Sequence, residues 1–290
     1  MNNFLTRILF VGIAVPLLFA LAVYVPFMNH AALAAIVLLF CAGTSLELVR
    51  MVEPDAAAIR SAIAVVLGIS PAVAVYVSRL AYPAQGLAAS WLAPLACIMI
   101  AEFLIAALPL ALPRRVDTIE TSIRRASANA LYLMYPGALG SAIIVILGAT
   151  DHSGQLLIWF AMIVFGNDSL AWLAGVTLGR NRGIFAVSPN KSLEGLIAGL
   201  AGSVACAFAG PFLFPAAVPR DWAALAALGS LCGVAVVIGD LFESAVKRSA
   251  GVKDSGTVVP GRGGVLDSFD SLLFAAPVFT GILAIIGILS

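Results

Sequence analysis

Long apolar stretches alternate with short charged segments along this chain. Nine of these stretches are each long enough to cross a hydrocarbon core of about 30 Å as a helix, with some tilt. They lack the period-two alternation of β-barrel strands, so the pattern predicts an all-α, polytopic bundle of about nine transmembrane helices. These helices are expected at about residues 5–27, 31–49, 61–81, 88–112, 127–149, 155–178, 193–214, 222–246 and 269–289.

The composition indicates that lipid covers much of this chain. Of the 290 residues, 62% are hydrophobic and only 11% are charged, which is too few charges for the surface of a soluble domain. Arg7 precedes a long apolar core without an Ala-x-Ala cleavage pattern, so the first helix is expected to be retained. The four cysteines lie in apolar stretches without CxxC spacing, which argues against a disulfide framework or a zinc site.

The basic residues are distributed unevenly between the two sets of loops. Of the 16 Lys and Arg residues, all but Arg7, Arg79 and Arg220 fall in the loops after the second, fourth, sixth and eighth predicted helices. Because basic loops stay on the cytoplasmic side, we expect these loops in the cytoplasm of a cell-membrane protein, with both termini outside. The loops around 180–192 and 247–268 then share one face.

Four polar residues near the end of the eighth predicted helix lie on one helical stripe: Asp240, Glu243, Ser244 and Lys247. Ionisable groups at membrane depth are costly, so they normally face a protein interior, a cavity or one another. The plainer alternative is a helix end where Glu243 and Lys247 pair at i,i+4 and extend toward water.

The segment after this helix is rich in glycine and carries both signs of charge. Glycines let backbone N–H groups approach anionic oxygens, Lys253 and Arg262 add positive charge, and Asp254, Asp267 and Asp270 can share divalent cations. Phosphoryl transfer uses this combination, with two metal ions neutralising the reacting phosphates and basic residues holding the rest of a nucleotide triphosphate. The alternative is an ordinary charged hairpin between two helices.

A second polar run, Asn167-Asp168-Ser169, interrupts the sixth predicted helix and implies a protein-lined cavity. Further on, Ser192 is predicted to cap the next helix, whose free amides could also receive phosphate. The glycine pairs 175/179 and 195/199 have the spacing of closely packed helices.

At these residues the sequence resembles the phosphatidate cytidylyltransferase family, also called CDP-diacylglycerol synthases. The family signature Ser-x-x-Lys-Arg, Lys-Asp-x-Gly, Pro-Gly-His-Gly-Gly, Asp-Arg-x-Asp stands here as SAVKR, KDSG, PGRGG and DSFD. The upstream elements match as DSLAW from Asp168 and SPNKSLEG from Ser188. The resemblance is clear over about residues 160–277 and weak in the first five helices.

The resemblance implies transfer of CMP from CTP to phosphatidate at the membrane, giving CDP-diacylglycerol and pyrophosphate with Mg²⁺, as two divalent ions. The implied partners are CTP, the lipid phosphate and membrane lipid, without nucleic acid, and a homodimer is left open. The implied metal carboxylates are Asp240, Asp267, Asp254 and Asp270; the catalytic residues are Asp240, Asp267, Lys247 and Lys253; the substrate-binding residues are Asp168, Ser188, Lys191, Ser244, Arg248, Gly261, Arg262 and Gly263.

Two positions depart from the signature: Arg262 replaces its His and Ser268 replaces its Arg. A guanidinium cannot exchange protons near neutral pH as an imidazole can. These departures leave an inactive paralogue open, and a paralogue acting on another lipid phosphate is a further alternative. A transporter, in which charges at the midplane bind a substrate or ion, is an alternative of a different class. Residues 1–150 are expected to form variable transmembrane helices, and residues 151–290 the helices that carry the motifs. Glu47 and Glu102, in or near apolar stretches, receive no partner from the sequence.

Overall fold

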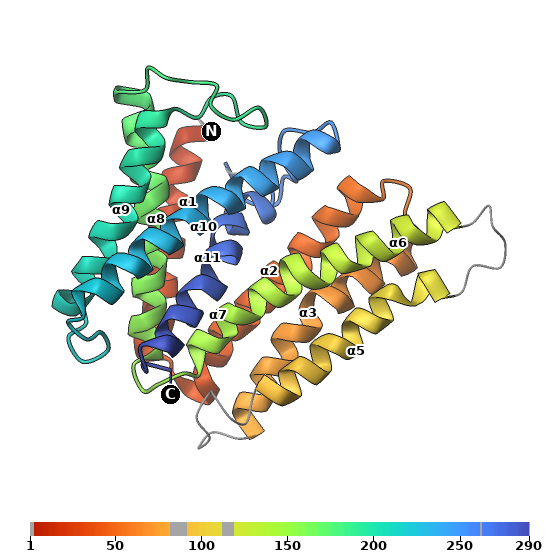
Figure 1. The fold of residues 1–290 in the computed structure, drawn as a ribbon, viewed down its shortest axis with the longest axis horizontal. Coiled ribbons are helices and arrows are strands. Elements are labelled where there is room, and N and C mark those ends of the chain that lie inside the picture. Colours follow the sequence, from red (N-terminus) through yellow and green to blue (C-terminus); the bar gives the residue numbers. More distant parts are fainter. Residues whose placement is uncertain (1–2, 82–91, 112–118, 262, 290) are drawn as a thin grey trace.

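The computed structural model describes residues 3–81, 92–111, 119–261 and 263–289, which form a bundle of helices (Figure 1). Within those residues every regular element is a helix, and isolated bridges join Arg182 to Ser192 and Val259 to Gly263 in the loops. The predicted all-α class is confirmed. In chain order the elements are α1 (Asn3–Tyr24), α2 (Phe27–Val52), α3 (Ala58–Ala81), α5 (Leu92–Ala111), α6 (Ile119–Tyr132), the π-helix η2 (Leu133–Ala138), α7 (Leu139–Leu147), α8 (Ser153–Thr177), α9 (Leu193–Leu213), α10 (Trp222–Ser249) and α11 (Leu266–Ile285).

Seven helical rods in the described part of the chain are long and apolar enough to cross a membrane. They are α2, α3, α8, α9, α10, α11 and the continuous rod Ile119–Leu147, which α6, η2 and α7 form together. Shorter apolar runs, Gly12–Tyr24 and Met99–Leu108, lie within α1 and α5. The chain is therefore a multi-pass helical membrane protein, and the total of nine crossings stays a prediction.

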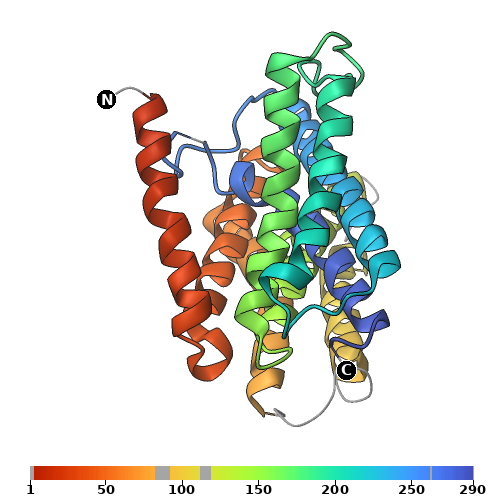
Figure 2. The same ribbon diagram turned by 90° about the vertical axis from the view of Figure 1, so that its left-hand side faces the viewer.

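The start of α1 and the end of α11 lie at opposite ends of the bundle (Figures 1 and 2). The start of α1 lies at the same end as the α8–α9 and α10–α11 loops. The expectation that both termini lie outside is therefore wrong. An odd number of crossings carries a chain from one side of a membrane to the other, so the two termini of such a chain cannot lie on the same side.

Helix α11 runs through the interior of the bundle and contacts α2, α7, α8 and α10. Its side chains Leu273, Phe279 and Leu283 are fully buried, and the Phe279 ring meets the Trp159 ring of α8 edge-on, with centroids 5.4 Å apart. This burial of apolar surface places the first turn of α11 against the last turns of α10.

Helices α8 and α9 pack at very short range, as the glycine spacing predicted. A Cβ atom on Gly199 would lie 2.8 Å from Asn167 Oδ1, and one on Gly195 would lie 2.7 Å from the Ala171 carbonyl oxygen. The Asn167 amide donates hydrogen bonds to Ser203 Oγ at 2.9 Å and to the Gly233 carbonyl at 3.4 Å. These contacts join α8, α9 and α10 into the unit that surrounds the site described next.

Candidate functional site

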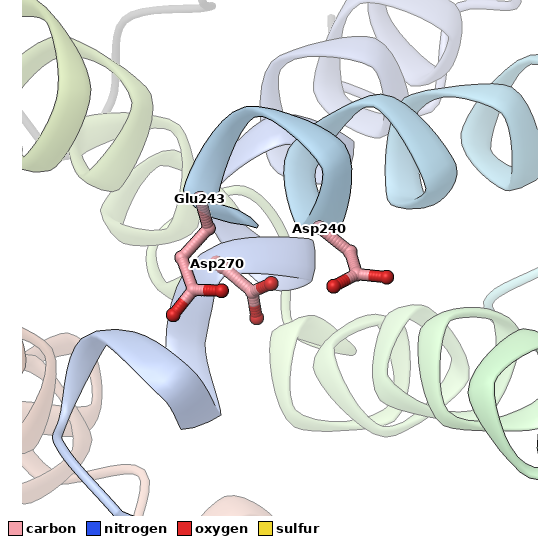
Figure 3. A group of neighbouring side chains, drawn as sticks. All are labelled: Asp240, Glu243 and Asp270. Atoms are coloured by element: carbon pink, nitrogen blue, oxygen red, sulfur yellow. The ribbon is translucent and has the colours of Figure 1, made fainter. Parts of the chain in front are cut away.

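Three carboxylates from two helices point toward one another near the motif-bearing end of the bundle (Figure 3). Asp240 and Glu243 lie three residues apart on α10 and therefore share a face, and Asp270 comes from the first turns of α11. One oxygen atom of each lies within 4.8 Å of the other two. Glu243 and Asp270 are 1% and 7% exposed, so these groups are largely withdrawn from water.

Two lysines pair with the carboxylates around this cluster. Lys247 Nζ lies 2.6 Å from Glu243 Oε2 and 2.6 Å from Asp267 Oδ1, and Lys191 forms an ion pair with Asp240. Three carboxylates thus pair with two cations, and Asp270 forms no ion pair among the described residues. Glu243 Oε1 is buried and has no hydrogen-bond partner. A buried, unpaired carboxylate oxygen beside two further carboxylates matches the oxygen ligands that Mg²⁺ prefers.

Asp267 lies beside this cluster but is engaged by the α10–α11 loop. Its Oδ2 accepts hydrogen bonds from the Ser255 amide at 2.8 Å, the Ser255 hydroxyl at 2.9 Å and the Gly264 amide at 2.7 Å. Its Oδ1 accepts from Lys247. Of the four expected metal carboxylates, the structure brings Asp240 and Asp270 together, holds Asp267 next to them, and leaves Asp254 exposed in the loop.

The remaining loop residues shape the turn between α10 and α11. Val259 and Gly263 exchange backbone hydrogen bonds of 2.8 and 3.1 Å. Gly263 has φ +112°, and a Cβ there would lie 2.7 Å from Asp267 Oδ2, so this turn requires glycine. Gly261 also has positive φ, and Lys253 is exposed in the same loop.

The other expected binding residues near this loop differ in their surroundings. Arg248 donates a hydrogen bond to the Val252 carbonyl at 3.3 Å, and Ser244 is buried on α10. Arg262 lies outside the described residues.

A cavity of about 410 Å³ opens beside Asp240, between α8, α9, α10 and the α8–α9 loop. Its rim includes Trp172 and Val176, which are 69% and 62% exposed. Ser188 does not line it, but its carbonyl accepts from the Lys191 amide at 3.2 Å and so shapes the loop. The polar lining residues are Asn167, Asp168, Arg182, Asn190, Lys191, Ser192 and Asp240.

Lys191 is one of two cations among the described residues that line this cavity, and Arg182 is the other. Burial lowers the pKa of its ammonium group, and the negative charges of Asp168 and other nearby carboxylates oppose that shift. Ser192 accepts a hydrogen bond from the Gly195 amide at 3.2 Å, which confirms the predicted cap of α9.

Three residues of the site were missed as site residues in the sequence. Glu243 shares a stripe with Asp240, a visible signal, but its pairing with Lys247 concealed its place in the cluster. Arg182 lines the cavity and donates to the carbonyls of Asn190 at 3.0 Å and Gly175 at 2.7 Å. Glu47 hydrogen-bonds to the α10–α11 loop, and its distance along the chain left no local signal.

Comparison with known proteins points to one family. The sequence model described as "Cytidylyltransferase family" matches residues 5–286. The Escherichia coli (strain K12) protein YnbB, described as uncharacterized, is 43% identical over 130 residues, or 44% of this chain and 42% of that protein. The phosphatidate cytidylyltransferase of Bacillus subtilis (strain 168) is 38% identical over 136 residues, or 47% of this chain and 50% of the relative.

A third relative, the phosphatidate cytidylyltransferase of Helicobacter pylori (strain J99), is 36% identical over 146 residues, which cover 50% of this chain and 53% of the relative. The chain thus spans about half the length of the curated relatives it matches. The match to the family model, in contrast, extends over almost all of this chain. We conclude that the chain belongs to the cytidylyltransferase family.

Proposed function

We propose that this protein transfers CMP from CTP to phosphatidate, giving CDP-diacylglycerol and pyrophosphate. The observation that carries the proposal is the cluster of Asp240, Glu243 and Asp270 beside a cavity that Lys191 lines. Carboxylates that can hold a divalent cation, next to a cavity lined by Lys191 and Arg182, are what transfer of a nucleotide requires. Membership of the family and the names of two of its relatives support the same reaction.

In the proposed reaction an oxygen of the phosphatidate phosphate forms a bond to the α-phosphorus of CTP. The bond from that phosphorus to the oxygen bridging the β-phosphate breaks, and pyrophosphate leaves with that oxygen. The Lys191 ammonium group would leave the Asp240 carboxylate and bind a phosphate oxygen instead. Arg182 would hold the wall of the cavity in place. Positioning and charge stabilisation are the protein's contributions to such a step.

Asp240, Glu243 and Asp270 are the residues that would hold Mg²⁺, since they offer only oxygen atoms and Glu243 Oε1 lacks a partner. When bound, the ion supplies positive charge against the phosphate oxygens. Lys247 keeps Glu243 and Asp267 in place from the opposite side. A second divalent ion would require Asp267 to release Lys247, because hydrogen bonds engage both Asp267 oxygens.

We propose that the site faces the cytoplasm, where CTP is made, at the surface of the cell membrane. Thirteen of the 16 basic residues fall in the loops predicted on that side. The exposed Trp172 and Val176 on the cavity rim would allow the acyl chains of the lipid to stay in the bilayer while its phosphate reaches Lys191. Residues 151–290 would carry the catalytic motifs, within a bundle that residues 1–150 complete.

A paralogue acting on another lipid phosphate is the second candidate. Ser268, where the resembling family has Arg, donates only a long hydrogen bond of 3.4 Å to the Gly264 carbonyl and supplies no positive charge to the first turn of α11. A smaller positive charge at this turn favours a lipid headgroup whose charge or shape differs from that of phosphatidate.

Purified protein supplied with CTP, Mg²⁺ and phosphatidate tests the proposal, with CDP-lipid and pyrophosphate as products. We expect Asp240→Asn and Asp270→Asn to abolish product formation. Asp221→Asn, at the other end of the same helix α10, should retain it, because Asp221 only accepts the cap hydrogen bond of Ala224. Product from polyprenyl phosphate but not from phosphatidate would favour the second candidate, and no product from either lipid would contradict both.

A further inference from the structure

Glu47 is a buried carboxylate on α2 that contacts the loop between α10 and α11. Its side chain is 2% exposed. Its Oε1 accepts the Val265 amide at 2.8 Å, and its Oε2 accepts the Leu266 amide at 2.9 Å and the Ser255 hydroxyl at 2.7 Å. Both carboxylate oxygens are therefore directed at one segment of chain more than 200 residues away.

These hydrogen bonds cap the start of α11 from a different helix. Val265 occupies the N-cap position of α11, and its side chain accepts no hydrogen bond from the free amides of the first helical turn. Glu47 accepts the amides of Val265 and Leu266, and its negative charge faces the positive end of the helix. A glutamine side chain has the same shape, but it would direct its NH2 group at one of these N–H or O–H donors. A carboxylate therefore suits the position better than glutamine.

The loop and α2 approach each other so closely that only glycine fits between them. A Cβ on Gly264 would lie 2.5 Å from Glu47 Oε2, and one on Gly256 would lie 2.6 Å from Glu47 Oε1. One turn earlier on α2, a Cβ on Gly43 would lie 3.0 Å from the Val265 side chain. The glycines therefore allow the carboxylate to reach the backbone of the loop.

A continuous series of contacts leads from Glu47 to the acidic cluster. The Ser255 hydroxyl lies 2.7 Å from Glu47 and 2.9 Å from Asp267. Asp267 pairs with Lys247, and Lys247 pairs with Glu243. The single proton of the Ser255 hydroxyl can be donated to only one of the two carboxylates at a time, so Glu47 and Asp267 share this loop residue.

We infer that Glu47 is a positioning residue for the proposed CMP transfer, on which this inference rests. By holding Ser255 in the loop and Val265 and Leu266 at the start of α11, it fixes Asp267 and Lys247 against Glu243. The cavity around Lys191 lies on α8, α9 and α10 and has no contact with Glu47 among its described lining residues. Loss of the Glu47 carboxylate should therefore affect turnover more than the binding of CTP.

The test compares Glu47→Gln, Glu47→Asp and Glu47→Ala with Glu53→Gln, a carboxylate that ends the same helix and contacts Arg60 and Tyr132 instead of the loop. Each variant is assayed well below its unfolding temperature, per folded protein. We expect kcat to fall about tenfold or more for Glu47→Gln, with KM for CTP within about threefold. Glu47→Asp should retain more activity than Glu47→Gln, and Glu53→Gln should match the wild type.

Limited trypsin digestion provides a readout that does not depend on activity. Lys253 and Arg180 are both exposed, so cleavage after Lys253 reports on the α10–α11 loop and cleavage after Arg180 serves as the internal reference. We expect Glu47→Gln and Glu47→Ala to accelerate the first cleavage and leave the second unchanged.

Unchanged cleavage after Lys253 in both variants would overturn the inference. A lower unfolding temperature with unchanged kcat would also overturn it, because Glu47 would then stabilise the fold without positioning the site. If the wild type makes no CDP-lipid, the proposed function fails, and the cleavage comparison alone decides whether Glu47 holds the loop.

Discussion

Lys247 Nζ lies 2.6 Å from Asp267 Oδ1 and so joins the last turn of α10 to the first turn of α11. The same nitrogen lies 2.6 Å from Glu243 Oε2. The cation thus contacts carboxylates from both helices and compensates their negative charge. The pairing makes Lys247 a structural part of the candidate site as well as a candidate catalytic residue.

Replacing Lys247 with methionine should destabilise the protein and abolish CMP transfer. Removing one partner from a buried ion pair leaves uncompensated charge and costs about 3–5 kcal/mol. Thermal unfolding followed by tryptophan fluorescence measures the loss of stability. Ser249→Ala, two residues later and exposed, is the control, since its hydroxyl only contacts the Val246 carbonyl. An unfolding temperature equal to that of the wild type would show that the pairing contributes little.

Glu243→Gln should weaken the binding of a divalent cation. The change retains the shape of the side chain but removes a negative charge from the cluster with Asp240 and Asp270. We expect the dissociation constant for Mn²⁺, measured by electron paramagnetic resonance, to rise about tenfold or more. Glu120→Gln removes an exposed carboxylate that pairs only with Arg124 and should leave Mn²⁺ binding unchanged. Equal affinity in both variants would place the cation elsewhere.

The sequence was sufficient for the fold class because membrane helices show in any apolar stretch of the required length. It also indicated that Asp240, Asp270 and Lys247 belong together, since helical spacing and short loops limit where such residues can lie. The capping role of Ser192 could be predicted for the same reason: the residues involved are three apart.

Contacts between distant segments could not be predicted in this way. The partners of Glu47 lie in a loop that only the packing of α2 against α11 brings near it. Likewise, the loop amides of Ser255 and Gly264 engage Asp267, and no sequence spacing reveals a backbone hydrogen bond of this kind. The error about the termini had a different cause. Nine predicted helices are an odd number of crossings, and an odd number already places the two termini on opposite sides of the membrane.

The affinity for CTP should fall in alkaline solution because of Lys191. Burial lowers its pKa, so its ammonium group loses its proton at a lower pH than an exposed lysine would. KM for CTP should therefore rise with pH in the window between this lowered pKa and the ordinary value of 10.5. Over the same window the unfolded chain binds more protons, so this group makes the free energy of unfolding rise.

Steady-state kinetics between about pH 7 and pH 10 measure this effect, with Lys191→Arg as the comparison. A guanidinium keeps its charge throughout that range, so the alkaline rise of KM should disappear in the variant. If both proteins showed the same pH profile, the titrating group would be another residue or the substrate itself.

Gly202→Ala should destabilise the packing of α8 against α9. A Cβ on Gly202 would lie 2.8 Å from the Gly166 carbonyl oxygen and 2.9 Å from Leu170 Cδ1, and the first of these is backbone that cannot turn away. Separating the two helices enough to admit a methyl group should cost about 1–3 kcal/mol. Gly281→Ala is the matched control, because it introduces the same methyl group on α11 where no atom of another described element lies within 4 Å. That control should be neutral or slightly stabilising, since alanine favours the helix more than glycine does. Unfolding temperatures of the two variants in one detergent measure the difference, and equal values would show that α8 and α9 can separate without cost.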